Sequence, residues 1–169
     1  MEEIMYSEKL QKAINEQINK EFYSSYLYLA MAAHFDANAL PGFAHWMKLQ
    51  AEEEWEHGMK FYEFLNEVGS EVTLEAIACP PKKFGTPKEI FEQVYEHEQM
   101  VTKSIENLYA LAKQENDPKT ELMLHWFINE QIEEEKNDRD ILDQLVMAGN
   151  NSFGILFLDK HVLGERKED

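Results

Sequence analysis

The sequence has few basic residues and almost no cysteine. Its 169 residues include 16 Lys and Arg against 33 Asp and Glu, which gives a formal charge of −17. Binding to nucleic acid or to an anionic membrane surface needs clustered Lys and Arg, so neither is an expected partner. The single Cys, Cys79, excludes an internal disulfide and any zinc or iron–sulfur site built from several cysteines. Cations are the expected partners of so acidic a chain.

Long apolar runs are also missing. No stretch of 18 apolar residues occurs, so we expect no membrane-spanning helix. The first residues contain no basic segment followed by an apolar run, so we expect no secretory signal and a cytoplasmic location. With 44% hydrophobic and 12% aromatic residues, the chain is too apolar for a disordered acidic segment. Its length suits a single domain over residues 1–169.

Proline and glycine are scarce, and they are grouped at a few positions. They divide the chain into four long segments at about 7–36, 42–68, 87–115 and 118–148, followed by a shorter apolar segment at 152–163. Thr86-Pro87-Lys88-Glu89 has the pattern of a capping box, and Asp117-Pro118 that of an N-cap followed by proline. No segment alternates polar and apolar residues with the period of a strand. We therefore predict an all-α protein.

The lengths of the connections predict the topology. Short turns join the first segment to the second and the third to the fourth, so each pair should form an antiparallel hairpin. The connection 69–86 is 18 residues long and could span roughly 60 Å when extended, enough to run the length of the bundle. This predicts a four-helix bundle with one long crossover, the ferritin-like connectivity, and a short fifth helix at the C-terminus.

The apolar stripe of each long segment is interrupted near its middle by ionisable residues. The residues expected to meet at mid-height are Glu21 in the first segment, Glu54 and His57 in the second, Glu98 in the third and Glu134 in the fourth. The stripes also contain Gln50 in the second segment and Gln131 and Asp138 in the fourth. Burying an unpaired carboxylate costs several kcal/mol, and none of the four stripes contains Lys or Arg. Either these groups are solvated, as runs of Glu usually are, or a metal neutralises them. The agreement in height among four segments favours the metal.

One pair of residues makes the metal interpretation more specific. Glu54 and His57 lie three residues apart, on one helix face, where they can bind the same ion. Alone this spacing is common, but with a Glu from each of the other helices it matches much of the di-iron carboxylate pattern of helical bundles. Many carboxylates with one imidazole suit iron or manganese better than zinc or copper.

At these residues the chain resembles the bacterial non-haem ferritins over nearly its whole length. The matching stretches are Asn19–Ser25, Ala51–His57, His97–Gln99, Asn129–Lys136 and Phe157–Lys160. The resemblance implies a ferroxidase centre in each subunit, which oxidises Fe(II) with dioxygen or hydrogen peroxide. It also implies a hollow 24-subunit shell that stores ferric mineral.

The resemblance also implies roles for individual residues. Glu21, Glu54 and His57 would hold the first iron, with Glu54 bridging to a second iron held by Glu98, and with Gln131 and Glu134 nearby. Glu53, Glu130 and Glu134, with Glu133 as a further candidate, match a third iron site. Tyr28 and Trp126 match aromatic residues near the centre, either as electron donors or as packing residues. Glu121 matches a position that lines the channels through which iron enters.

Two departures separate the chain from related families. A symmetric di-iron enzyme or a bacterioferritin carries a second Glu-x-x-His on the fourth helix, where this chain has Gln131-Ile132-Glu133-Glu134. Bacterioferritins place a haem-ligand Met close to the bridging Glu, whereas Trp55 follows Glu54 here, so we expect no haem. Without an imidazole, the second iron should be held less firmly and released more readily once oxidised.

Three other interpretations are open at this stage. A di-iron oxidase acting on a small molecule would keep its metals, and the missing second motif argues against it. A DNA-protecting mini-ferritin would bind iron between subunits, whereas these ligands lie on all four helices of one chain. A purely structural bundle would bind no metal. The remaining histidines, for which we expect surface or packing roles, are His34, His45, His97, His125 and His161.

Overall fold

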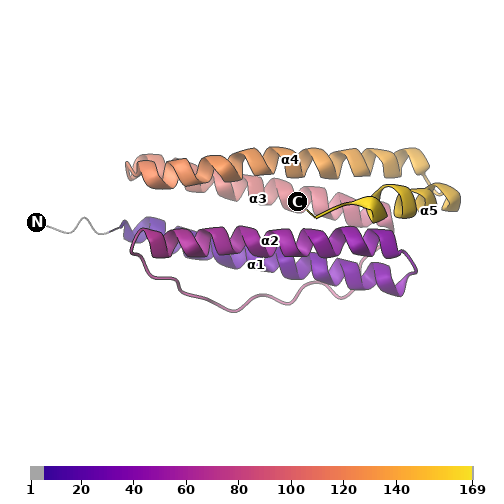
Figure 1. Cartoon of the computed structure of the whole chain (residues 1–169), viewed down its shortest axis with the longest axis horizontal. Helices are drawn as coiled ribbons and strands as arrows, with labels where there is room; N and C mark the ends of the chain where they lie inside the picture. The colour runs from indigo at the N-terminus through magenta and orange to yellow at the C-terminus, as the bar shows by residue number, and fades with distance from the viewer. Residues whose placement is uncertain (1–5, 169) are drawn as a thin grey trace, which may run out of the picture.

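The computed structural model describes residues 6–168, and every regular element within that range is a helix. The helices are α1 (Glu8–Ala37), α2 (Pro41–Glu67), α3 (Pro87–Gln114), α4 (Pro118–Ala148), α5 (Ser152–His161) and the 3-10 turn η1 (Leu163–Glu165). The four long helices lie side by side and α5 lies at one end of the bundle (Figure 1). The predicted fold class, with its long crossover and short fifth helix, is confirmed. None of the described helices combines the length and apolar character needed to cross a membrane.

Polar side chains fix where the long helices begin. The Ser7 hydroxyl accepts a hydrogen bond from the backbone N–H of Leu10 at the start of α1. At the start of α3, Thr86 and Glu89 form the predicted capping box, each side chain accepting from the other residue's backbone N–H. Asp117 caps α4. Helices α2, α3 and α4 each have proline in the first turn, where the missing N–H costs no hydrogen bond.

The crossover, residues 69–86, follows α1 along the outside of the bundle (Figure 1). Two side chains of α1 hold its backbone. Asn15 accepts a hydrogen bond from the N–H of Thr73 at 2.8 Å, and Asn19 donates to the carbonyl of Ala76 at 3.2 Å. The extended segment thus satisfies part of its backbone hydrogen bonding through side chains of α1.

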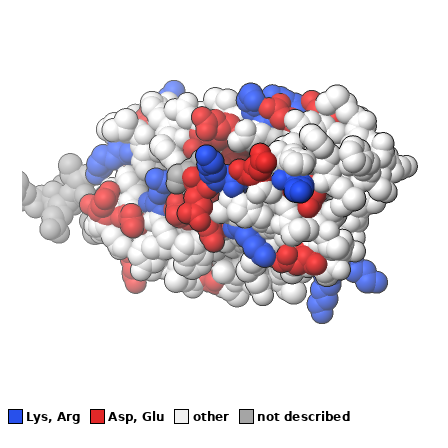
Figure 2. Space-filling model, turned by 45° about the vertical axis from the view of Figure 1, so that its right-hand side comes forward, with Lys and Arg blue, Asp and Glu red and all other residues white. Residues whose placement is uncertain are grey.

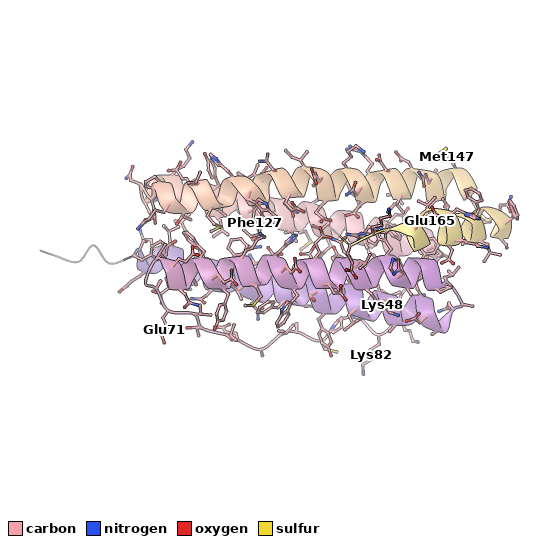
Figure 3. The ribbon with its side chains drawn as sticks, viewed as in Figure 1. Lys48, Glu71, Lys82, Phe127, Met147 and Glu165 are labelled. Atoms are coloured by element: carbon pink, nitrogen blue, oxygen red, sulfur yellow. The ribbon has the colours of Figure 1, made fainter. Side chains whose placement is uncertain are left out.

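The core consists of two apolar clusters with a polar layer between them. One cluster, on the α5 side, contains the buried aromatics Phe35, Phe43 and Phe91. The other contains Phe61 and Phe127, whose rings stack with centroids 4.0 Å apart; Figure 3 labels Phe127 between α4 and α2. The buried polar side chains of the bundle interior include Gln17, Glu21, Gln50, Glu54, His57, Glu98, Gln131, Glu134 and Asp138. The mid-height interruptions of the stripes are therefore a buried layer and not a solvated face.

The C-terminal residues pack back onto α2. The backbone N–H of Phe43, in the first turn of α2, donates to the Asp159 carboxylate of α5 at 2.9 Å. After α5 the chain returns toward the middle of the bundle, with Glu165 between α2 and α4 (Figures 1 and 3). Gly42 allows this approach because a Cβ atom there would lie 1.7 Å from the backbone oxygen of Asp159.

Replacing Gly42 by Ala is expected to destabilise the protein by about 3 kcal/mol or more, because the added carbon meets backbone that cannot rotate away. Chemical denaturation checks this. Gly69→Ala is the control: nothing lies within 4 Å of that position, and its cost comes only from the positive φ of 73°, about 1 kcal/mol. A Gly42→Ala loss no larger than the Gly69→Ala loss would contradict the close packing of α5 on α2.

Candidate metal centre

The first group of potential ligands joins α1 to α2. Glu21, Glu54 and His57 are buried, and each offers a ligand atom within 4.8 Å of those of the other two. The Nδ1 atom of His57 lies 3.2 Å from Oε2 of Glu54. Gln17, one turn before Glu21, donates its amide to Oε1 of Glu21 at 2.7 Å. The second oxygen of Glu21 is buried without a hydrogen-bond partner among residues 6–168, which suits a metal ligand.

The second group joins α2 to α3 and α4. Glu54, Glu98 and Glu134 are buried and again offer ligand atoms within 4.8 Å of one another. Glu54 belongs to both groups, so its carboxylate lies within reach of the ligand atoms of both. The Gln131 amide donates to Oε2 of Glu98 at 3.1 Å. We call these two groups, with Glu21, Glu54, His57, Glu98 and Glu134, the inner centre.

A third group lies beside the inner centre and nearer the surface. Glu53 and Glu130 are partly buried, and with His57 they offer ligand atoms within 4.8 Å of one another. The Nε2 atom of His57 lies 3.9 Å from Oε1 of Glu130, so the two ring nitrogens face different groups. We call Glu53, His57 and Glu130 the outer site. The exposed Glu133 lines a groove with Glu53, Glu130 and Glu134.

Burial of several carboxyl groups together changes their acidity. Desolvation, and then the nearby Glu98, raise the pKa of Glu54 and of Glu134 well above the ordinary value. Desolvation also raises the pKa of Glu21 and of Glu98. No Lys or Arg within residues 6–168 pairs with the carboxylates of the inner centre. Burial without metal therefore favours the protonated form of these carboxyl groups, and a divalent cation competes with the proton for the same oxygens.

Two aromatic residues singled out from the sequence lie close to the inner centre. The Tyr28 hydroxyl is fully buried and donates to Oε1 of Glu98, and desolvation raises its pKa well above the ordinary value. The Trp126 ring is 39% exposed, with its centroid 5.4 Å from that of His57. Glu121 is not part of this arrangement. It lies in the first turn of α4, ten residues and about 15 Å along the helix from Gln131.

The structure adds residues to which the sequence assigned no role. The Gln50 amide donates to Oε2 of Glu134 at 2.8 Å and to Oε1 of Glu54 at 3.3 Å, so it links α2 to α4. Asp138 is fully buried, and neither of its oxygens has a hydrogen-bond partner within the described chain. Gln50 and Asp138 lie in the predicted stripes, and that periodicity is the signal that could have found them.

Arg166 is a further residue of the site, and no sequence pattern indicated a role for it. It donates to Oε2 of Glu53 at 2.5 Å and to Oε1 of Gln50 at 2.8 Å. The four stripes contain no Lys or Arg. The cation beside Glu53 comes from the C-terminal segment, outside the periodic pattern of the helices.

The other histidines lie outside the three groups. His97 is hydrogen-bonded to the Ser24 hydroxyl at 2.8 Å, and burial lowers its pKa to about 4.

Gly58, next to His57, allows α2 to pack closely against α1, since a Cβ there would lie 2.4 Å from the Phe22 ring.

Comparison with known proteins places this arrangement in a family. A ferritin-like domain matches residues 11–148. A bacterial non-heme ferritin of Bacteroides fragilis is 43% identical over 96% of this chain and 100% of its own length, and one from Campylobacter jejuni is 37% identical over 94% and 95%. The crystal structure of an open pore ferritin from Archaeoglobus fulgidus superposes with a TM-score of 0.94, at 46% identity and 95% and 98% coverage. With the helical bundle and the buried carboxylates, these matches establish that the chain belongs to the ferritin family.

Proposed function

We propose that the protein stores iron by oxidising Fe(II) at the inner centre and collecting the ferric product inside a shell of identical subunits. The observation that carries this proposal is the shared position of Glu54, which belongs to both ligand groups within one chain. A carboxylate in that position holds two ions close together, which a paired oxidation requires. Both ions are substrates, so the ligands must bind Fe(II) and also release the product.

Each ligand has a distinct part in this proposal. Glu21 and His57 hold the first Fe(II), Glu98 and Glu134 hold the second, and Glu54 bridges them. Each Fe(II) gives one electron, so a pair, together with two protons from water, reduces dioxygen to hydrogen peroxide or hydrogen peroxide to two molecules of water. The protons that the carboxyl groups hold without metal are released on binding, and no side chain need act as a general acid or base.

The polar neighbours orient the ligands. Gln17 and Gln50 donate to Glu21 and Glu54, and Tyr28 donates to Glu98, so each of these carboxylates keeps an oxygen fixed by a hydrogen bond. Such partners hold metal ligands in a productive geometry. We assign Tyr28 this positioning role.

The two inner ions should differ in affinity. The first has the His57 imidazole, whereas the second has carboxylates and the Gln131 amide nearby. We propose that the second ion is held less firmly and leaves first after oxidation. A third ion binds at the outer site, whose carboxylates are partly exposed and face the groove lined by Glu133 and Glu134.

The surface around α5 supports assembly into a shell. Large apolar side chains are exposed there on the described chain, namely Val146, Met147, Phe153, Leu156 and Phe157. Exposed apolar side chains gathered in one region of a surface mark a protein interface. We propose that identical subunits cover it, in a 24-subunit shell.

Aerobic loading with Fe(II), followed by size-exclusion chromatography and iron analysis of the protein peak, tests the proposed function. We expect a shell-sized particle that retains far more iron than its ligands could coordinate. A small particle that saturates at two or three irons per chain would contradict storage and favour a di-iron enzyme that keeps its metals.

A further inference from the structure

The C-terminal segment reaches the outer site through one residue, Arg166. Its guanidinium donates to Oε2 of Glu53 at 2.5 Å and to Oε1 of Gln50 at 2.8 Å. Both members of the ion pair are mostly buried, with 18% of the Arg166 side chain and 19% of the Glu53 side chain exposed. Figure 2 shows Lys and Arg side chains among the Asp and Glu side chains gathered in the middle of one face. Arg166 therefore supplies a positive charge to a carboxylate that is also a potential metal ligand.

Two further contacts fix the position of the guanidinium. It lies 4.7 Å from the centre of the Trp46 ring, within the range of a cation–π interaction. The backbone carbonyl of Arg166 is hydrogen-bonded to Nε2 of His45 at 2.8 Å. Because side chain and backbone are both held by α2, the guanidinium is placed at Glu53 at little further cost in conformational entropy.

The contact with Gln50 connects Arg166 to the inner centre. A guanidinium can only donate hydrogen bonds, so it fixes the amide oxygen of Gln50 on its own side. The amide N–H groups must then point the other way, where they reach Glu54 and Glu134. Arg166 thus sets the orientation in which Gln50 supports two inner ligands.

We propose that Arg166 is an internal cation that competes with metal for the outer site. It neutralises Glu53 when no third ion is present, and a divalent cation bound by Glu53 and Glu130 displaces it. Displacement frees the C-terminal segment from Glu53, so metal binding and the position of this segment are coupled. The inference rests on the proposed function, since it takes the outer site to bind a metal.

Titration with Zn²⁺, which is not oxidised, tests the competition by calorimetry on the assembled metal-free protein. Arg166→Gln should tighten binding of the third ion about three- to tenfold, the range expected for removing one competing ion pair. Arg166→Lys keeps the charge but not the forked geometry, and should give a smaller change. Arg139→Gln, which removes the only other Arg of the chain, an exposed one on α4, should leave the affinity unchanged.

Hydrogen–deuterium exchange of residues 162–168 gives a second readout. If Arg166 had only a structural role, the exchange rate of this segment would not change on metal binding. Exchange should speed up when the wild-type protein takes its third Zn²⁺, and should not respond in Glu53→Gln. Equal third-ion affinity in wild type and Arg166→Gln, or tail exchange that does not rise with the third ion, overturns the inference while leaving the proposed function intact. Absence of Zn²⁺ at the inner centre as well would overturn the proposed function itself.

Discussion

Replacing Glu54 by Gln is expected to slow aerobic Fe(II) oxidation by at least about 10- to 100-fold, the loss typical when the support of a metal site is damaged. Glu54 is the carboxylate common to both ligand groups of the inner centre, so the substitution weakens both iron positions at once. Gln is close to Glu in size and can still accept from Gln50, so the fold should survive. The change removes the negative charge and one metal-binding oxygen.

Stopped-flow absorbance of ferric product, recorded with two Fe(II) added per subunit, measures this effect. Glu63→Gln is a suitable control because Glu63 lies on the exposed side of the same helix and belongs to none of the three ligand groups. That variant should oxidise Fe(II) at the wild-type rate. Equal rates in Glu54→Gln and Glu63→Gln would show that oxidation occurs elsewhere, and the bridging role of Glu54 would be wrong.

The metal-free protein should become more stable as the pH falls through the raised pKa values of its buried carboxyl groups. Burial raises the pKa of Glu54, Glu134 and Asp138 well above the values of the unfolded chain. In this range the folded state therefore binds protons that the unfolded state has lost, and stability increases on acidification. The gain is about 1.4 kcal/mol per pH unit for each carboxyl that remains protonated only in the folded state.

One buried group opposes this trend at lower pH. His97 has its pKa lowered to about 4, so below pH 6.5 the unfolded chain gains a proton that folded His97 does not accept. The contribution of His97 to the stability of the folded state falls as the pH drops from 6.5 to 4. This loss offsets the gain from one buried carboxyl group. Below pH 6.5, His97 therefore reduces the net gain in stability per pH unit.

Thermal unfolding of the chelator-treated protein between pH 5 and pH 8 measures this dependence. Asp138→Asn should flatten the curve without removing a proposed ligand, because one buried carboxyl no longer titrates. Saturating Zn²⁺ should reverse the slope, since the bound metal competes with protons. Stability of the metal-free protein that declines steadily from pH 8 to pH 5 would contradict a protonated carboxylate layer.

The bundle and the height of its polar layer could be predicted because both depend on local rules. Prolines at positions 41, 87 and 118 mark where three helices begin, and the helical period then determines which face each Glu occupies. The long connection leaves few ways to join the two hairpins. The positions of Glu21, Glu54 and Glu98 on the inward faces of their helices follow from that helical period alone.

Contacts made by irregular segments could not be predicted in the same way. Arg166 lies 113 residues from Glu53 in the sequence and follows a short 3-10 turn, so no period relates the two. The approach of Gly42 to Asp159 likewise depends on how α5 folds back. The hydrogen bonds of Gln50 to Glu54 and Glu134 could not be predicted either. They depend on how α2 and α4 are rotated relative to each other, and side-chain packing determines that rotation.

Anomalous diffraction at the iron edge, from crystals soaked anaerobically with Fe(II), tests most directly whether the buried carboxylates hold a pair of ions. We predict two interior peaks, one beside Glu21 and His57 and the other beside Glu98, with the Glu54 carboxylate between them. A weaker third peak beside Glu53 and Glu130 should accompany a displaced Arg166. Iron found only on the acidic surface, with no density among the buried carboxylates of the four helices, would contradict the account.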